Sequence, residues 1–419
     1  MTWSASIVLR RLVLLAALAL GRCGGGSVGD APGAGTTVGS DIGSGGTGIA
    51  GASPGGVGSG GTGVTADAGV GSVDGFGSII VNGVRYDIAT ATTLLSDVTE
   101  LKLGMTVRVT GTLSAALTQG TATLVVSAAD LRGAVANLKA DGTFTVLGVQ
   151  VSTDPTTVYA GGLMAFSGLV NGVNVQVHGL PGDDGQLHAT RIERLAAAQA
   201  PVLTGYVQEV DRSARTFRIG TQRVSYAAAN FPGDWPSSRL GDGVVVRVRA
   251  STVASTLAAT TVEPWNPTPL RDGSRLSLGG LITDYAGVQS LRIDGVPADI
   301  SAARLTGSGN ATMANGARVE ATGTMLGGVL RVSTFRIRQA APVAAVTPAV
   351  DDTVFTARGS VGAYRSASDF KVQGQQVDAS GATFVGGTAA DLGSSRKVLV
   401  SGSRVRDDVL VADRVEFLN

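Results

Sequence analysis

Cysteine and histidine are nearly missing from this sequence. Cys23 is the single cysteine, and His178 and His188 are the two histidines. A single cysteine excludes an intramolecular disulfide and a thiolate metal cluster. Two imidazoles exclude most metal sites and most catalysis by a Ser-His or Cys-His pair. We therefore expect no catalytic residues, no metal site and no cofactor, which means a protein that is not an enzyme.

Aromatic and charged residues are also scarce. Aromatics make up 5% of the 419 residues and charged residues 16%, against 43% hydrophobic residues and 61 glycines. This composition favours short strands joined by tight turns. Lys and Arg together number 33 and Asp and Glu 32, so no strong long-range attraction to nucleic acid exists. We expect no nucleic-acid partner.

The N-terminus has the pattern of a bacterial export signal. The pair Arg10-Arg11 precedes an apolar run at residues 12–20. This run is too short to cross a bilayer as a helix, so residues 1–22 are predicted to be a signal peptide.

Cys23 ends a motif that resembles a lipobox, Leu20-Gly21-Arg22-Cys23, although Arg22 stands where Gly, Ala or Ser is usual. Lipidation of Cys23 would attach the exported chain to a membrane. Gly24, in place of Asp, is similar to the pattern of outer-membrane lipoproteins. The alternative is cleavage near Ala19, which would release a soluble periplasmic or secreted protein.

Residues 23–70 are predicted to form a disordered, Gly-rich tether. From residue 24 to residue 70 the segment has no aromatic, Lys or Arg residue. It cannot bury enough apolar surface to offset the conformational entropy of ordering the chain.

The rest of the chain contains five copies of one pattern. A first apolar element recurs as Ile79-Ile80-Val81-Asn82-Gly83, Phe144-Thr145-Val146-Leu147-Gly148, Phe217-Arg218-Ile219-Gly220-Thr221, Leu291-Arg292-Ile293-Asp294-Gly295 and Phe370-Lys371-Val372-Gln373-Gly374. A second element, such as Val107-Arg108-Val109-Thr110-Gly111, follows each at a nearly fixed distance. We predict β repeats at residues 71–132, 133–196, 203–264, 277–340 and 353–419.

Apolar residues alternate in these elements, which is the period of a strand with one buried face. Asn82-Gly83 and Asp294-Gly295 are typical of two-residue hairpin turns. A lone unit of this size is marginally stable, and closing its sheet removes the edges. The predicted fold is all-β: a tandem array of about five small OB-like or SH3-like barrels, with a β-sandwich as the alternative.

The motif Gly75-Phe76-Gly77-Ser78-Ile79-Ile80-Val81-Asn82-Gly83 resembles the opening of the bacterial domain-of-unknown-function 5666 family. Leu131-Arg132-Gly133-Ala134-Val135 resembles the start of that family's next copy. The resemblance is close for residues 71–195, and the third to fifth repeats fit by spacing more than by identity. Members are typically lipoproteins with a start similar to Cys23-Gly24-Gly25-Gly26. The family has no established activity, so the resemblance implies fold and location.

Most polar candidates have a structural explanation. His178 and His188 are expected on the surface, on adjacent strands. The second elements carry varied residues on their outward face, which argues against five equivalent binding sites: Arg108, Gln176, Arg247, Glu320 and Leu399. Acidic pairs such as Asp407-Asp408 are explained as turn residues. Arginines such as Arg336 and Arg338 are expected on solvated strand faces.

Two Pro-rich loops of the third repeat hold Phe231, Trp235 and Trp265. Loop aromatics can stack on sugars or anchor a partner, so these three residues are candidate ligand-binding residues. The alternative is that they pack into the junction between the third and fourth repeats.

The sequence thus predicts a non-enzymatic lipoprotein, held in the outer membrane by its N-terminal lipid and acting as a structural or interaction scaffold. An envelope protein or polysaccharide is the expected partner. The alternative function is binding of an envelope polysaccharide or other ligand through the Trp-bearing loops.

Overall fold

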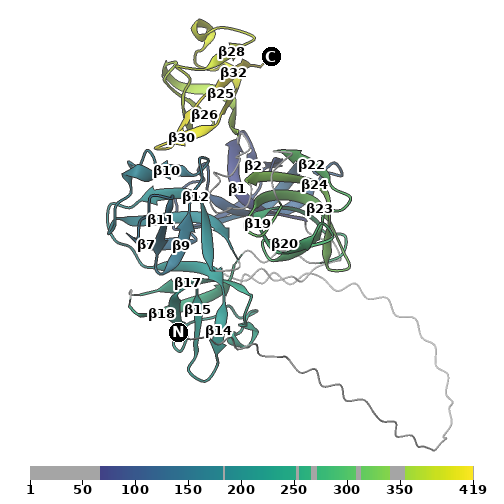
Figure 1. Cartoon of the computed structure of the whole chain (residues 1–419). Coiled ribbons are helices and arrows are strands. Elements are labelled where there is room, and N and C mark those ends of the chain that lie inside the picture. The colour runs from purple at the N-terminus through teal and green to yellow at the C-terminus, as the bar shows by residue number, and fades with distance from the viewer. Residues whose placement is uncertain are drawn as a thin grey trace, which may run out of the picture. The chain divides into compact units, whose positions relative to one another are not determined.

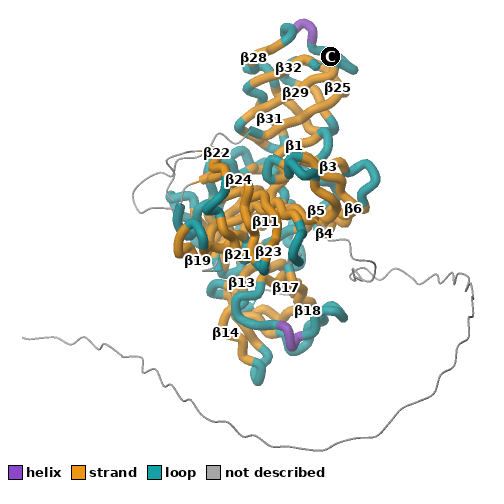
Figure 2. Tube along the Cα trace, turned by 90° about the vertical axis from the view of Figure 1, so that its right-hand side faces the viewer, coloured by secondary structure: helices purple, strands orange, loops and turns teal. Residues whose placement is uncertain are grey.

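The computed structural model describes residues 67–182, 185–251, 254–265, 271–307, 313–339 and 354–418. Within them the regular structure is β-strand apart from short 3₁₀ turns (Figure 2), which confirms the predicted all-β class. None of the described helices is long and apolar enough to cross a membrane. The predicted signal peptide, Cys23 and the tether up to residue 66 lie outside the described residues.

Unit 1, the first group of strands, closes into a five-stranded barrel. Unit 1 contains β1 (Asp67–Phe76), β2 (Ile79–Val81), β3 (Val84–Asp87), β4 (Thr92–Ser96), β5 (Thr106–Leu113) and β6 (Gln119–Ala128). All of these except β4, which pairs with β6 beyond β3, form the barrel. β1 pairs antiparallel with β2 and β5, β2 with β3, and β5 with β6. A parallel pairing of β3 with β6 completes the ring, so the five strands have no open edge. Because β1 begins at Asp67, the last four residues of the predicted tether belong to this barrel.

Units 2 and 3 repeat this order of pairing (Figure 1). Unit 2 contains β7 (Leu131–Ala136), β8 (Thr143–Val146), β9 (Val149–Ser152), β10 (Val158–Ala160), β11 (Asn174–Pro181), β12 (Gln186–Arg194) and a 3₁₀ turn at Phe166–Gly168. Unit 3 contains β13 (Val202–Tyr206), β14 (Gln208–Asp211), β15 (Thr216–Ile219), β16 (Gln222–Ser225), β17 (Val245–Ala250), β18 (Thr256–Pro264) and a 3₁₀ turn at Ser237–Arg239. In unit 3, β13 and β14 together take the place of a single first strand.

Units 4 and 5 follow the same scheme. Unit 4 contains β19 (Arg275–Gly287), β20 (Ser290–Ile293), β21 (Val296–Asp299), β22 (Arg304–Gly307), β23 (Arg318–Leu326) and β24 (Val329–Gln339). Unit 5 contains β25 (Phe355–Ser366), β26 (Asp369–Val372), β27 (Gln375–Asp378), β28 (Thr383–Val385), a 3₁₀ turn at Ala389–Asp391, β29 (Lys397–Gly402), β30 (Arg404–Arg406), β31 (Val409–Val411) and β32 (Arg414–Phe417).

The predicted hairpin turns are confirmed. Asn82 and Gly83, with φ of 52° and 75°, connect β2 to β3. Asp294 and Gly295, with φ of 49° and 75°, connect β20 to β21 in the same way. Asn, Asp and Gly adopt this left-handed conformation more easily than other residues, which explains why they occupy the turns.

Glycine is the last residue of most of the second elements, because the backbone of the paired strand lies too close to that position for a side chain. A Cβ atom on Gly111 would lie 2.0 Å from the Thr121 carbonyl oxygen, and one on Gly323 would lie 2.2 Å from the Arg331 carbonyl oxygen. The strand pairing shifts register at both glycines. Such bulges bend a strand, as closure of a small barrel requires.

The buried residues show which face of each strand points into the core. The first residue of each first element is at most 3% exposed: Ile79, Phe144, Phe217, Leu291 and Phe370. Apolar packing also continues between units. One cluster joins units 2 and 3, a second joins units 1 and 5, and a third packs Ala68 and Val70 of β1 against unit 4.

Candidate functional site

The outward faces of several second elements are covered by neighbouring units and do not face solvent. Gln176, Arg247 and Glu320 are 3%, 1% and 7% exposed. The prediction that these residues form a varied exposed face is therefore wrong. Arg338, predicted on a solvated face, is also buried. Charged side chains are rarely buried without partners, so we expect ion pairs and hydrogen bonds at the junctions between units.

Asp97 lies where units 1, 2 and 3 meet. Its Oδ1 accepts hydrogen bonds from Arg132 Nη2 at 2.8 Å and Arg249 Nη1 at 2.9 Å. Its Oδ2 accepts from Arg249 Nη2 at 3.0 Å and from Arg247 Nη2. Burial acts to raise the pKa of Asp97, but these three guanidinium groups outweigh it and hold the pKa below its usual value. We call these four residues the Asp97 clasp.

Arg247 extends the clasp toward the loops of unit 3. Its Nε donates to the Ala129 carbonyl oxygen at 2.9 Å, and its Nη1 pairs with Glu263 at 3.2 Å. Its guanidinium lies 5.1 Å from the centroid of the Trp265 ring, a cation–π distance. A single planar side chain with five N–H donors thus contacts units 1 and 3 together, whereas lysine carries three donors on one nitrogen.

Asp130 forms a second buried group beside the clasp. Its Oδ2 accepts from Thr106 Oγ1 at 2.7 Å and the Gly179 amide at 2.9 Å, and its Oδ1 accepts from Trp265 Nε1 at 2.7 Å. Burial raises the pKa of Asp130 to about 6, although these hydrogen bonds and Arg247 oppose the rise. Since the Thr106 proton is donated to Asp130, the contact of 3.1 Å between Thr106 Oγ1 and His178 Nδ1 requires the proton on His178 Nδ1.

Both histidines are buried, so the prediction that they lie on the surface is wrong. His178 and His188 are 1% and 6% exposed, because the face of unit 2 that carries them packs against other units. Burial and the charges of Arg191 and Arg247 lower the pKa of His178 to about 3. No group of three potential ligands able to hold a metal ion occurs among the described residues.

A third charged group joins units 1, 2 and 4. Arg318 Nη1 donates to Asp154 Oδ2 at 3.2 Å and Thr156 Oγ1 at 2.9 Å, and its Nη2 donates to Ser72 Oγ at 3.3 Å. His188 Nε2 lies 2.9 Å from the same Asp154 oxygen. Burial of Asp154 acts to raise its pKa, but His188 and Arg318 outweigh burial and lower it.

Arg338 continues this junction between units 1 and 4. Its Nε donates to Glu320 Oε1 at 2.6 Å, and its Nη2 donates to Asp74 Oδ2 at 3.0 Å. Each of these three side chains is less than 10% exposed. Two acids share one arginine here, and burial together with the nearby Glu320 charge raises the pKa of Asp74, although Arg338 opposes the rise.

Unit 5 contacts units 1 and 2 through Asp408. Arg191 Nη1 donates to Asp408 Oδ1 at 2.6 Å, and Lys102 Nζ donates to Asp408 Oδ2 at 2.8 Å. Asp407 and Asp408 form the predicted turn, with φ of 43° and 63°. Asp408 therefore forms ion pairs with unit 1 and unit 2 in addition to being a turn residue. The other two acidic pairs, Asp183-Asp184 and Asp351-Asp352, lie outside the described residues.

The candidate ligand-binding aromatics make packing contacts. Phe231 and Trp235 stack with ring centroids 5.9 Å apart, and Phe231 meets Tyr226 edge-on at 6.0 Å. Both half-buried rings pack against the core shared by units 2 and 3. Trp265 contacts Asp130 and Arg247, at the junction of units 1, 2 and 3. Ligand binding by Phe231, Trp235 and Trp265 stays a prediction, because these contacts neither require nor contradict it.

The role of Trp265 can be measured with Trp265→Phe. This change keeps most of the ring but removes the donor to buried Asp130. We expect a loss of about 1–3 kcal/mol in the free energy of unfolding, determined by urea denaturation. Trp235→Phe is the matched control, since the Trp235 indole donates no hydrogen bond within the described residues, and it should cost less. Equal losses in the two variants would argue against a structural role for the Asp130 bond.

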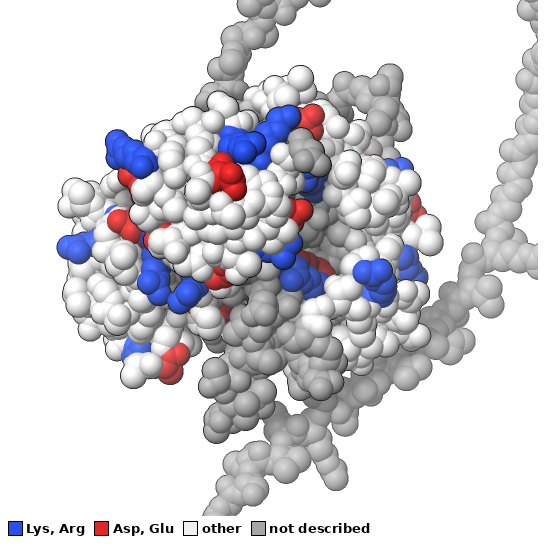
Figure 3. Space-filling view, turned by 90° about the horizontal axis from the view of Figure 1, so that it is seen from above, with Lys and Arg blue, Asp and Glu red and all other residues white. Residues whose placement is uncertain are grey.

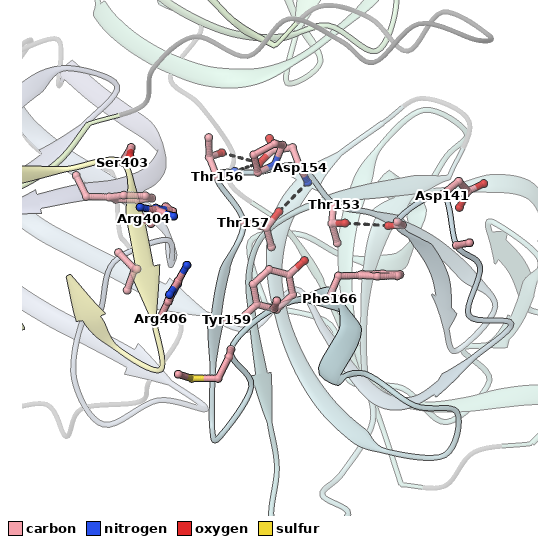
Figure 4. A pocket seen from close by; sticks show the side chains of 17 residues that line it. Asp141, Thr153, Asp154, Thr156, Thr157, Tyr159, Phe166, Ser403, Arg404 and Arg406 are labelled. Carbon is pink, nitrogen blue, oxygen red and sulfur yellow. Dashed lines mark hydrogen bonds between the residues drawn. The ribbon is translucent and has the colours of Figure 1, made fainter. Parts of the chain in front are cut away.

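A cavity of about 440 Å³ lies between unit 2 and β30 of unit 5 (Figure 4). Tyr159 and Phe166 are on the unit 2 side, and Arg404 and Arg406 are on the other side. Asp154 also borders the cavity, with its carboxylate held by His188 and Arg318. A free nucleophile with an adjacent base is not found among the lining residues that the structure describes.

The comparison with protein families identifies three of the five units. Residues 69–124, 132–193 and 358–416 match the model described as Domain of unknown function (DUF5666). These are units 1, 2 and 5, so unit 5 matches by sequence and not by spacing alone. No curated protein matches the chain. The chain therefore belongs to the proteins that carry the DUF5666 domain, here in three copies.

Proposed function

We propose that this chain is a non-enzymatic scaffold of the bacterial cell envelope, built from five OB-like barrels and tethered by a lipid on Cys23. The observation that carries the proposal is the Asp97 clasp, in which one buried carboxylate pairs with arginines from two other units. The charged side chains of the junctions are committed to holding units together. Fixed units would present loops and surfaces at set positions to an envelope protein or polysaccharide.

The OB-like assignment rests on the order of strand pairing. In unit 1 the first strand pairs with both the second strand and β5, and the third strand runs parallel to the last. This is the connectivity of a small Greek-key barrel of the OB type. The recurrence of the same order in the other units supports extending the assignment to them.

The exposed charges support a scaffold that does not bind nucleic acid. On the face shown in Figure 3, Lys and Arg side chains are interspersed with Asp and Glu side chains. A nucleic-acid site needs a continuous basic surface, because binding depends on neutralising many phosphates.

The proposed anchor is tested with Cys23→Ser. The change removes the acylated sulfur, so the protein should move from the membrane fraction to the soluble periplasmic fraction. Cell fractionation followed by immunoblotting measures this shift. The same distribution for wild type and variant would contradict lipidation and favour cleavage near Ala19.

A further inference from the structure

Two arginines of unit 5 face the cavity described above without a partner. Arg404 and Arg406 flank Val405 on β30, and Val405 is buried. Alternate residues of a strand share one face, so both arginines lie on the side opposite to Val405. Figure 4 shows them beside the cavity, toward Thr157 and Tyr159. Neither side chain makes an ion pair or hydrogen bond with another described residue, in contrast to the arginines of the junctions.

The wall of the cavity contributed by unit 2 is partly aromatic. Tyr159 is 8% exposed and is held in place by strand pairing, since its carbonyl oxygen accepts from the Asp407 amide at 3.0 Å. Phe166 packs on Phe144, with ring centroids 6.3 Å apart. Met164, which is 59% exposed, adds a flexible apolar side chain. A volume of about 440 Å³ is within the range of small-ligand sites.

Hydroxyl groups and two carboxylates, those of Asp141 and Asp154, complete the lining. Asp141 accepts two hydrogen bonds from Thr143, both at Oδ1, so its Oδ2 is available as an acceptor. The side chains of Ser403 and Thr156 also line the cavity. Asp154 also lines the cavity but is paired with His188 and Arg318, so the charged side chains of the lining without an ion pair are Arg404, Arg406 and Asp141.

We propose that this cavity binds an acidic saccharide, with the sugar carboxylate on Arg404 and Arg406 and the ring against Tyr159 and Phe166. Guanidinium groups match the planar geometry of a carboxylate. An aromatic face suits the apolar face of a sugar ring. Asp141 Oδ2 would accept a hydrogen bond from a sugar hydroxyl, whereas it would repel a phosphate ion, which offers less donor capacity. The proposal goes beyond the scaffold role and does not depend on it.

Calorimetric titration of the mature chain with a short oligogalacturonate tests the site. We expect binding to the wild type, and a loss of affinity of about 100-fold or more in Arg404→Gln/Arg406→Gln, because two charge-assisted interactions are removed. Arg365→Gln is the matched control, as the Arg365 side chain is 81% exposed in the same unit, and it should bind as the wild type does. The melting temperature should be unchanged in both, since the substituted side chains are exposed.

Two further probes separate an acidic saccharide from other ligands. Maltotriose, which has no carboxylate, should bind much more weakly than oligogalacturonate. Inorganic phosphate should also bind weakly, and Asp141→Asn should weaken oligogalacturonate binding. Equal binding of maltotriose would overturn the proposal. Preferential binding of phosphate that Asp141→Asn strengthens would also overturn it. The same holds if the double arginine variant still binds oligogalacturonate, or if the wild type binds no oligogalacturonate at millimolar concentration.

Discussion

Asp97→Asn is expected to lower the free energy of unfolding by about 3–5 kcal/mol, because it leaves buried arginines without their counter-charge. Asn keeps the shape of the side chain and tolerates the φ of 72° at this position, so the loss reports the charge and not a strained backbone. Urea denaturation followed by circular dichroism measures it.

Glu209→Gln is the matched control for this experiment. Glu209 pairs with Arg218 at 2.9 Å, but the two side chains are 68% and 39% exposed. Exposed pairs contribute about 0–1 kcal/mol, so this variant should be nearly as stable as the wild type. If Asp97→Asn is no less stable than Glu209→Gln, the clasp does not hold the units together.

The protein is expected to unfold in acid, with most of the loss below about pH 4. Asp97, Asp154 and Asp408 have pKa values lowered in the native state, where arginine, lysine or histidine partners outweigh the effect of burial. An unfolded Asp titrates near pH 4. A group with a depressed native pKa contributes stability above its unfolded pKa, and this contribution is lost as the pH falls through the native pKa. Several kcal/mol should therefore disappear between about pH 4 and pH 2.

Between pH 7 and pH 4 two opposite effects should nearly cancel. The free energy of unfolding should therefore stay nearly constant or increase slightly as the pH falls. His178 has a native pKa of about 3, below its unfolded value of about 6.5, so it destabilises the native state as the pH falls. Asp130 and Asp294 have native pKa values raised by burial to about 6 and about 7, and they stabilise the native state as the pH falls. Asp74, whose pKa burial also raises, acts in the same direction.

Urea unfolding at intervals between pH 7 and pH 2.5 gives the full profile. Asp154→Asn removes one of the carboxylates with a lowered pKa, so its stability should fall less steeply below pH 4 than that of the wild type. A wild-type stability that falls steadily from pH 7 to pH 4, with no steeper loss below, would contradict the assigned pKa shifts.

The strands and turns could be predicted because their signals are local. Alternating apolar residues indicated strands, and Asn82-Gly83 indicated a hairpin turn, since both depend on the conformations of a few adjacent residues. The junctions could not be predicted in this way. An outward residue such as Arg247 or Gln176 has the same sequence pattern whether it faces solvent or a neighbouring barrel. The partners Asp97 and Arg247 are 150 residues apart, and nothing in either segment alone indicates the pairing.

One compositional signal pointed toward the buried charges. Lysine occurs at just four positions, 102, 139, 371 and 397, among 33 basic residues. Surfaces use both basic residues, whereas buried ion pairs favour the planar guanidinium group. The excess of arginine over lysine, together with arginines in the middle of apolar strands, was a sign that some strand faces are covered. The cavity beside β30 depends on unit 2 and unit 5 together, so no local pattern could reveal it.

Coupling between the units can be measured through the two tryptophans of the mature chain. Trp3 lies in the predicted signal peptide, so Trp235 and Trp265 in unit 3 and its flanking loop give the fluorescence signal. Phe335, which is 0% exposed in the core of unit 4, belongs to a different apolar cluster. Phe335→Ala should destabilise unit 4 by about 3–5 kcal/mol.

Urea unfolding of this variant, followed by tryptophan fluorescence and by far-ultraviolet circular dichroism, separates the alternatives. If the buried ion pairs couple the units, the fluorescence midpoint should fall together with the circular dichroism midpoint, although the mutation is in another unit. A fluorescence midpoint equal to that of the wild type, with an earlier partial loss of the circular dichroism signal, would show that the units unfold independently and that the buried ion pairs do not couple them.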